Sequence, residues 1–119
     1  MTGSPISDLS PVLMASGTKL LILSSTEPNG KWVKFDRGFF TGYRKNLLKP
    51  DEIIGSVWIP YTSPTEYVVA YKQSRRREDD IAIVNGAFFF DIAPGQVNHL
   101  KINQIFAKLF IGRHDLKFC

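Results

Sequence analysis

The most densely charged stretch of the sequence, Lys72–Ala82, sets three arginines directly before three carboxylates. These are Arg75–Arg77 and Glu78–Asp80, and apolar runs flank the stretch at Tyr67–Tyr71 and Ile81–Val84. Charge runs of this kind are most often solvated turns that keep two strands soluble. The alternative is a loop that places charges beside a ligand. Composition alone leaves both interpretations open.

A second stretch, Asp36–Lys45, combines aromatic rings with cations. It holds two glycines, three aromatic residues and three cations, and we expect a loop with one helical turn. Aromatic and basic side chains together can stack a planar ring and hold its phosphates. In the alternative interpretation, Phe39 and Phe40 fill the core while Arg44 and Lys45 face water.

The sequence gives little support for other catalytic or metal chemistry. The two histidines, His99 and His114, lack a metal-ligand spacing, and Cys119 is the single cysteine. Adjacent carboxylates along Glu78–Asp80 diverge, which disfavours a paired acid and base. We therefore expect no catalytic residue and no metal site within this chain.

Length and composition indicate a folded domain or a piece of a larger one. The chain has 119 residues, of which 44% are apolar and 13% aromatic, so it can bury a core. Its net charge is +4, without a basic stripe on one expected element. No apolar run approaches the ~18 residues of a membrane-spanning helix, and the first residues lack a signal-peptide pattern. We expect a cytoplasmic location, with the peroxisome as the alternative.

The first half of the chain predicts one helix and a strand hairpin. Ser7–Gly17 should form a short helix that ends at Gly17, and Thr18–Ser24 should be an internal strand because its centre is apolar on both faces. Glu27-Pro28-Asn29-Gly30 is a hairpin signal, in which Asn-Gly favours positive φ at both central positions. Lys31–Phe35 should be the returning strand.

The second half predicts mostly strands. We expect strands at Ile53–Ile59, Glu66–Lys72 and Ile81–Phe90, the last interrupted by a turn signal at Asn85-Gly86. Val97–Phe110 fits either a strand or an amphipathic helix. The expected fold class is α+β, mostly antiparallel sheet with one short N-terminal helix.

Three stretches, in this order and spacing, together resemble a known family. They are Ser4–Ala15, Phe39–Leu48 and Lys72–Ala82, and the second is followed by Asp51–Ile54 and Ile59–Tyr61. They resemble the PCMH-type FAD-binding domain of the molybdo-flavoenzyme family that holds xanthine dehydrogenase and aldehyde oxidase. The resemblance implies that residues 1–65 are the C-terminal half of that domain. Residues 66–119 would begin a domain like the C-terminal domain of CO dehydrogenase flavoprotein, with an atypical tail at 96–119.

The resemblance implies an electron-transfer chemistry. In the family, a substrate is hydroxylated at a molybdenum–pterin centre, and electrons pass through 2Fe–2S clusters to FAD and then to NAD or O₂. The molybdopterin and 2Fe–2S ligands are not in this chain. We therefore expect a fragment of a homodimeric oxidoreductase, inactive alone, whose partners are FAD and NAD, without nucleic acid or membrane.

The resemblance also assigns roles to individual residues. Three would contact FAD: Asp8, Ile54 and Lys72. Three others would line the NAD site or tune the flavin: Tyr43, Arg76 and Asp79. Asp8 could instead cap the first helix, a role for which Ser7 is the other candidate.

The alternative function is a small basic β-rich module that binds single-stranded nucleic acid. Tyr43, Arg44, Lys45 and Arg75–Arg77 would then stack on bases and contact phosphates. Steeply salt-dependent binding to an oligonucleotide would identify this function.

Overall fold

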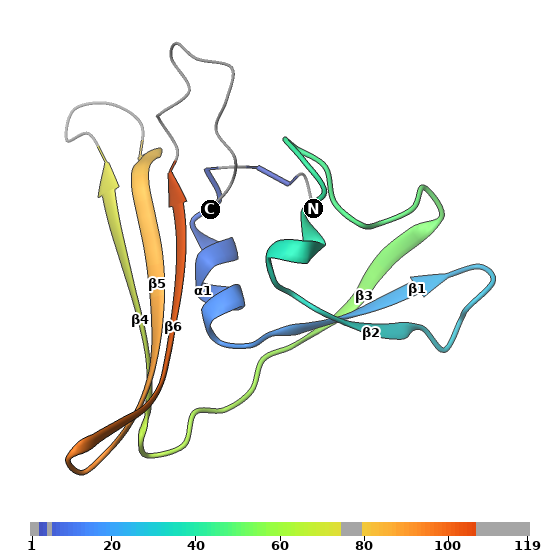
Figure 1. Cartoon of the computed structure of the whole chain (residues 1–119). Coiled ribbons are helices and arrows are strands. Elements are labelled where there is room, and N and C mark those ends of the chain that lie inside the picture. The colour runs from blue at the N-terminus through green and yellow to red at the C-terminus, as the bar shows by residue number, and fades with distance from the viewer. Residues whose placement is uncertain (1–2, 5, 75–79, 107–119) are drawn as a thin grey trace.

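The computed structural model describes residues 3–4, 6–74 and 80–106, with side chains described as far as residue 100. Within these residues one short helix, one 3-10 turn and six strands follow in order (Figure 1). They are α1 (Leu9–Ala15), β1 (Lys19–Ser24), β2 (Lys31–Lys34), η1 (Arg37–Phe39), β3 (Glu52–Trp58), β4 (Glu66–Ser74), β5 (Ala82–Ala93) and β6 (Gln96–Phe106). The expected α+β class with mostly antiparallel sheet and one N-terminal helix is confirmed.

At the start of helix α1, the side chain that accepts the capping hydrogen bond is that of Ser7 and not that of Asp8. The Ser10 backbone N–H donates to Ser7 Oγ at 3.2 Å, which satisfies one of the free amide groups of the first turn. Asp8 occupies the N-cap position but accepts no capping hydrogen bond. The Asp8 carboxylate is therefore available for other contacts.

The end of α1 is set by Gly17, as predicted. Gly17 takes φ +77°, a conformation that favours glycine. Its N–H donates to the Met14 carbonyl, and the Thr18 N–H donates to the Leu13 carbonyl. This pair of hydrogen bonds turns the chain directly into β1.

The first sheet has the strand order β2-β1-β3, and both pairs are antiparallel. Its central strand β1 matches the internal strand that the sequence predicts. One sheet face buries a cluster to which α1 and η1 also contribute: Leu13, Leu20, Ile22, Phe35 and Phe39. The Phe35 and Phe39 rings meet edge to face at 5.1 Å, so the phenylalanines of the aromatic stretch help to fill the core.

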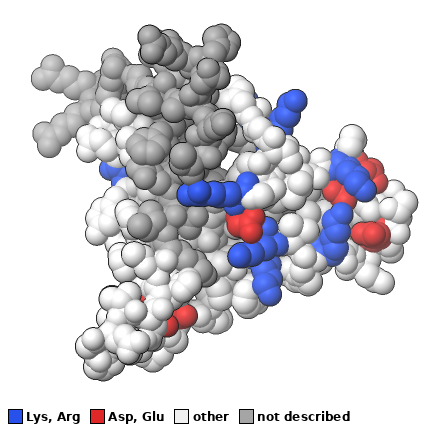
Figure 2. All heavy atoms as spheres, in the orientation of Figure 1, with Lys and Arg blue, Asp and Glu red and all other residues white. Residues whose placement is uncertain are grey.

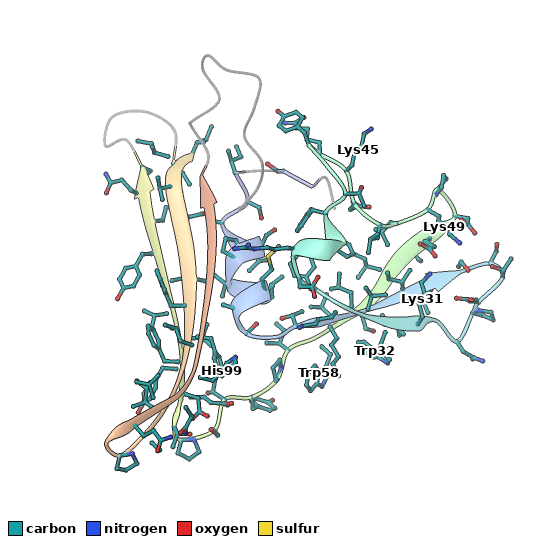
Figure 3. All side chains as sticks on the ribbon, in the orientation of Figure 1. Lys31, Trp32, Lys45, Lys49, Trp58 and His99 are labelled. Atoms are coloured by element: carbon teal, nitrogen blue, oxygen red, sulfur yellow. The ribbon has the colours of Figure 1, made fainter. Side chains whose placement is uncertain are left out.

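The opposite face of this sheet carries two exposed tryptophans. Trp32 and Trp58 project from the same side of the sheet (Figure 3) and are 53% and 47% exposed. The Lys19 Nζ lies 5.2 Å from the Trp58 ring centroid. Tryptophan fluorescence would therefore report on the first sheet.

The β1–β2 hairpin forms, but its turn differs from the predicted one. Among the four turn residues only Gly30 has positive φ, at +69°. The Gly30 N–H donates to the Glu27 carbonyl at 3.0 Å, so Pro28 and Asn29 are the central residues. Proline fixes a negative φ, which explains why positive φ at both central positions was wrong.

The second sheet has the strand order β4-β5-β6 and is again antiparallel. The expected turn at Asn85-Gly86 is wrong, since both residues pair with Lys72 and Tyr71 within the ladder. Residues 94–95 instead make the tight turn between β5 and β6. The segment from Gln96 forms a strand, which decides the alternative between strand and helix over residues 96–106.

Helix α1 packs against one face of the second sheet, although β1 follows it directly in the chain (Figure 1). Its contacts are with β4, β5 and β6. At the same time Leu13 belongs to the core cluster of the first sheet. The helix therefore packs against both sheets and connects them.

Candidate functional site

An ion pair joins the start of α1 to the end of β4. Lys72 Nζ lies 2.8 Å from Asp8 Oδ2 and donates a hydrogen bond to it, although 64 residues separate the two in the chain. The same ammonium lies 2.8 Å from Asp80 Oδ1. The fold thus brings together two of the three residues that the resemblance assigned to FAD.

The two carboxylates keep Lys72 charged. The hydrogen bond to Asp8, followed by the one to Asp80, raises the pKa of the Lys72 ammonium above its usual value. One positive and two negative charges leave these three groups with a net charge of −1. An ammonium has three N–H donors, and the described residues engage two of them. Lys72 can therefore donate a hydrogen bond to a ligand, but the two carboxylates offset its positive charge.

A small open hollow lies beside this pair, where α1 meets β4 and β5. Its volume is about 180 Å³. Its lining residues are Asp8, Pro11, Ala70, Tyr71, Lys72, Asn85 and Gly86. The small residues on β4 and β5 leave the space open, and the charged groups stand on its wall.

Asn85 is a part of this site that the sequence interpretation missed. Its side chain donates to the Ser7 carbonyl at 3.0 Å and to Asp8 Oδ1 at 3.3 Å. We interpreted Asn85-Gly86 as a turn, although Asn85 is buried in the central strand. Its position directly opposite Lys72 could have revealed it, but only if the register of β4 on β5 had been known.

The structure describes two of the remaining predicted residues, Ile54 and Tyr43, and both lie away from the Asp8–Lys72 pair. Ile54 lies in β3 of the first sheet, paired with Ile22 and packed against the core cluster. Tyr43 is 59% exposed in the turn of residues 42–45, with the Arg44 guanidinium 6.0 Å from its ring. Arg76 and Asp79 lie outside the described residues, and so do Arg75 and Arg77.

Some surface cations in the described part of the chain pair with carboxylates. Lys31 and Lys34 lie 2.8 Å from Glu52 and 3.9 Å from Asp36. Figure 2 shows the same mixing, with lysine and arginine groups interspersed with acidic groups on the face in view. Nothing in this arrangement favours the nucleic-acid alternative, which depends on clustered cations.

Neither a metal site nor a membrane span is found among the residues described. No group of three or more His, Cys, Asp and Glu side chains converges in that part of the chain. His99 instead lies beside Phe89, with ring centroids 6.3 Å apart. Within the same residues no helix is long and apolar enough to cross a bilayer.

Two family models match the chain. The first is described as the FAD binding domain in molybdopterin dehydrogenase and matches residues 1–62. The second is the CO dehydrogenase flavoprotein C-terminal domain and matches residues 69–105. Asp8 falls within the first match, whereas Lys72 and Asn85 fall within the second.

Curated relatives are similar over most of this chain. It is 58% identical over 105 residues to the xanthine dehydrogenase/oxidase of Gallus gallus, an alignment that covers 87% of this chain. It is 47% identical over 108 residues to the xanthine dehydrogenase of Calliphora vicina, covering 89% of this chain. The chain spans only 8% of the length of either relative.

Solved structures show the same fold. A carbon monoxide dehydrogenase from Hydrogenophaga pseudoflava superposes with a TM-score of 0.74 at 24% identity. That alignment covers 87% of this chain and 35% of the solved chain. A quinoline 2-oxidoreductase from Pseudomonas putida 86 gives a TM-score of 0.67 at 20% identity, with 87% and 34% covered.

Proposed function

Since the chain belongs to the family of the FAD binding domain in molybdopterin dehydrogenase, we propose that it forms part of the FAD site of a xanthine dehydrogenase-like oxidoreductase. The resemblance expected from the three sequence stretches is confirmed by the family matches and by the relatives. The function of the whole enzyme is a proposal, because the chain spans 8% of those relatives.

The observation that carries the proposal is the Asp8–Lys72 pair beside the hollow. The pair joins the two segments that the family models match, at the junction of α1 and β4. Lys72 can donate to a carbonyl of the flavin ring, and the carboxylates can accept from a ring N–H or a hydroxyl group. The polar groups therefore fit one edge of FAD.

The size of the hollow limits how much of FAD this chain can hold. Pockets that enclose a drug-sized ligand measure about 300–1,000 Å³, and this hollow measures about 180 Å³. The chain thus supplies one wall of the site, and Asp8 and Lys72 orient the edge that they contact. When bound, FAD would supply the redox chemistry itself. Ile54 is proposed to contact FAD as well, and Tyr43, Arg76 and Asp79 are proposed to line the NAD site or to tune the flavin.

The proposed parent enzyme passes electrons from molybdenum and iron–sulfur centres through FAD to NAD or O₂. Iron–sulfur clusters are held mainly by cysteines, and this chain has one. Those centres therefore belong to other parts of a homodimeric enzyme in the cytoplasm or the peroxisome. Residues 1–65 would belong to the FAD-binding domain and residues 66–119 to the next domain, a division close to the gap between the two family matches.

A flavin titration of the purified chain tests the proposal. We expect FAD well below one equivalent in the protein as purified, because this chain supplies only one wall of the proposed site. Adding FAD to the ¹⁵N-labelled chain should shift amide resonances around Asp8, Lys72 and Asn85 and leave those around Trp32 unchanged. Lys72→Met should abolish these shifts, whereas the matched surface variant Lys31→Met should preserve them. Equal shifts in both sheets, or none near Lys72, would overturn the proposal.

A further inference from the structure

Asn85 is a buried polar residue whose side-chain amino group forms hydrogen bonds while its side-chain oxygen forms none among the described residues. It lies in the middle of the central strand β5 and is 4% exposed. Both of its hydrogen bonds run from the Nδ2 amino group to the loop that enters α1. Its Oδ1 is buried, and no donor among the described residues reaches it.

The orientation of this amide follows from its neighbours. Nδ2 faces the Ser7 carbonyl and one oxygen of the Asp8 carboxylate, which are both acceptors. A rotated amide would set Oδ1 against the same two acceptors and would form neither bond. The asparagine therefore acts as a double donor toward residues 7 and 8.

Simple packing does not explain an asparagine at this position. A leucine of similar size would fill the space without the buried, unpaired Oδ1 of Asn85, which is a destabilising feature. The benefit of Asn85 must lie in its two donors. One donor holds a backbone carbonyl, and the other holds a side chain at the hollow.

The two oxygens of the Asp8 carboxylate have different partners. Asn85 Nδ2 donates to Oδ1 at 3.3 Å, while Lys72 Nζ donates to Oδ2 at 2.8 Å. The Asp8 side chain is 54% exposed, so without two anchors it could adopt several rotamers. Donors from β4 and β5 together fix the plane of this carboxylate.

We infer that Asn85 is a positioning residue for the Asp8 carboxylate. It holds Oδ1 so that Oδ2 faces Lys72, and through the Ser7 carbonyl it ties the start of α1 to β5. This inference rests on the proposed function only in that Asp8 would contact FAD. The geometry that it assigns exists in the chain without FAD, so it can be tested separately.

Three-bond couplings across the Asp8 Cα–Cβ bond test the inference in the 119-residue chain without flavin. We expect one staggered rotamer in the unaltered chain and averaged couplings in Asn85→Leu. Thr18→Val is the control, because it removes a different fully buried polar group that bonds only to Ser16 Oγ among the described contacts. Asp8 should keep its single rotamer in that variant. A single Asp8 rotamer in Asn85→Leu would overturn the inference.

A second measurement keeps the test valid if Asn85→Leu does not fold. Solvent exchange of the Asn85 side-chain NH₂ should be slow in the unaltered chain and faster in Asp8→Ala, because one acceptor is lost. Asp80→Ala, which also removes a carboxylate from Lys72, should leave that exchange rate unchanged. Equal exchange rates in Asp8→Ala and the unaltered chain would overturn the inference, whatever the flavin titration shows.

Discussion

At the residue scale, Glu52 provides a charge whose effect on stability should depend on pH. A hydrogen bond from Lys31 Nζ at 2.8 Å, and then the Lys49 backbone N–H, lower the pKa of the Glu52 carboxyl. A lowered pKa in the folded state gives stability that is present above the unfolded value, about 4.3. That stability is lost as the pH falls through the folded pKa.

The corresponding measurement is the melting temperature between pH 7 and pH 2. Glu52→Gln should melt below the unaltered chain at pH 7, and the difference should shrink below pH 4. Lys31→Met should weaken the same pH dependence, whereas Lys34→Met, whose nearest carboxylate oxygen is 3.9 Å away, should not. A difference that is constant across this range would contradict the assignment.

A second prediction at this scale concerns the buried ring of Phe39. Phe39 is fully buried and meets Phe35 at 5.1 Å and Phe40 at 5.4 Å. Replacing a buried phenylalanine by alanine leaves a cavity and costs about 3–5 kcal/mol of unfolding free energy. Urea denaturation of Phe39→Ala should show this loss. The same truncation at exposed Tyr43 should change the unfolding free energy by less than about 1 kcal/mol.

Single residues also show where the sequence was informative about the site. The resemblance assigned Asp8 and Lys72 to one ligand, and they form an ion pair. Asn85 was missed because Asn-Gly is also the strongest local turn signal. Only the pairing of β4 with β5 sets Asn85 opposite Lys72, and a local pattern contains no information on register.

At the element scale, the β1–β2 hairpin depends on Gly30. Gly30 has φ +69°, and a Cβ at this position would lie 2.7 Å from the Ile22 carbonyl oxygen. Gly95, in the β5–β6 turn, has φ +79° with no atom within 4 Å of a Cβ. The left-handed conformation alone costs an L-residue about 1–2 kcal/mol.

The two glycines therefore form a matched pair for alanine substitution. Gly95→Ala should lower the unfolding free energy by about 1–2 kcal/mol from backbone strain. Gly30→Ala should lower it further, because the hairpin must also open around the new methyl group. Urea denaturation of both variants measures the difference. Equal losses of unfolding free energy in the two variants would contradict this prediction, because they would show that β1 accommodates the new methyl group without further destabilisation.

Local patterns predicted most elements but not their limits. Capping and glycine signals placed α1 between Ser7 and Gly17, and apolar runs, alternation and the hairpin signal placed β1 to β5, whereas β6 was left open between strand and helix. The β5 strand continues past its predicted end at Phe90 to Ala93, because Asp91 pairs with Glu66 of β4, and Ile92 and Ala93 pair with β6. The partner strands, which lie outside any local window, decided that length.

At the scale of the whole molecule, the order of elements along the chain differs from their packing. The proposed domain division falls near residue 65, yet α1 from the first part packs on the sheet of the second. Leu13 on the same helix fills the core of the first sheet. Helix α1 has buried residues toward both sheets. The local sequence does not indicate which sheet each of these residues packs against, so this arrangement could not be predicted from sequence patterns.

Separate expression of residues 1–65 and 66–119 tests whether the division is structural. The face of the second sheet that α1 covers would be open in the second piece alone, so that piece should show little native amide dispersion by NMR. Mixing the pieces should restore the dispersion, because α1 would cover the sheet again. Tryptophan fluorescence follows the first piece, which carries both Trp32 and Trp58. Native dispersion in the isolated second piece would show that the family boundary is a true folding boundary, and that α1 only rests on a sheet that is already formed.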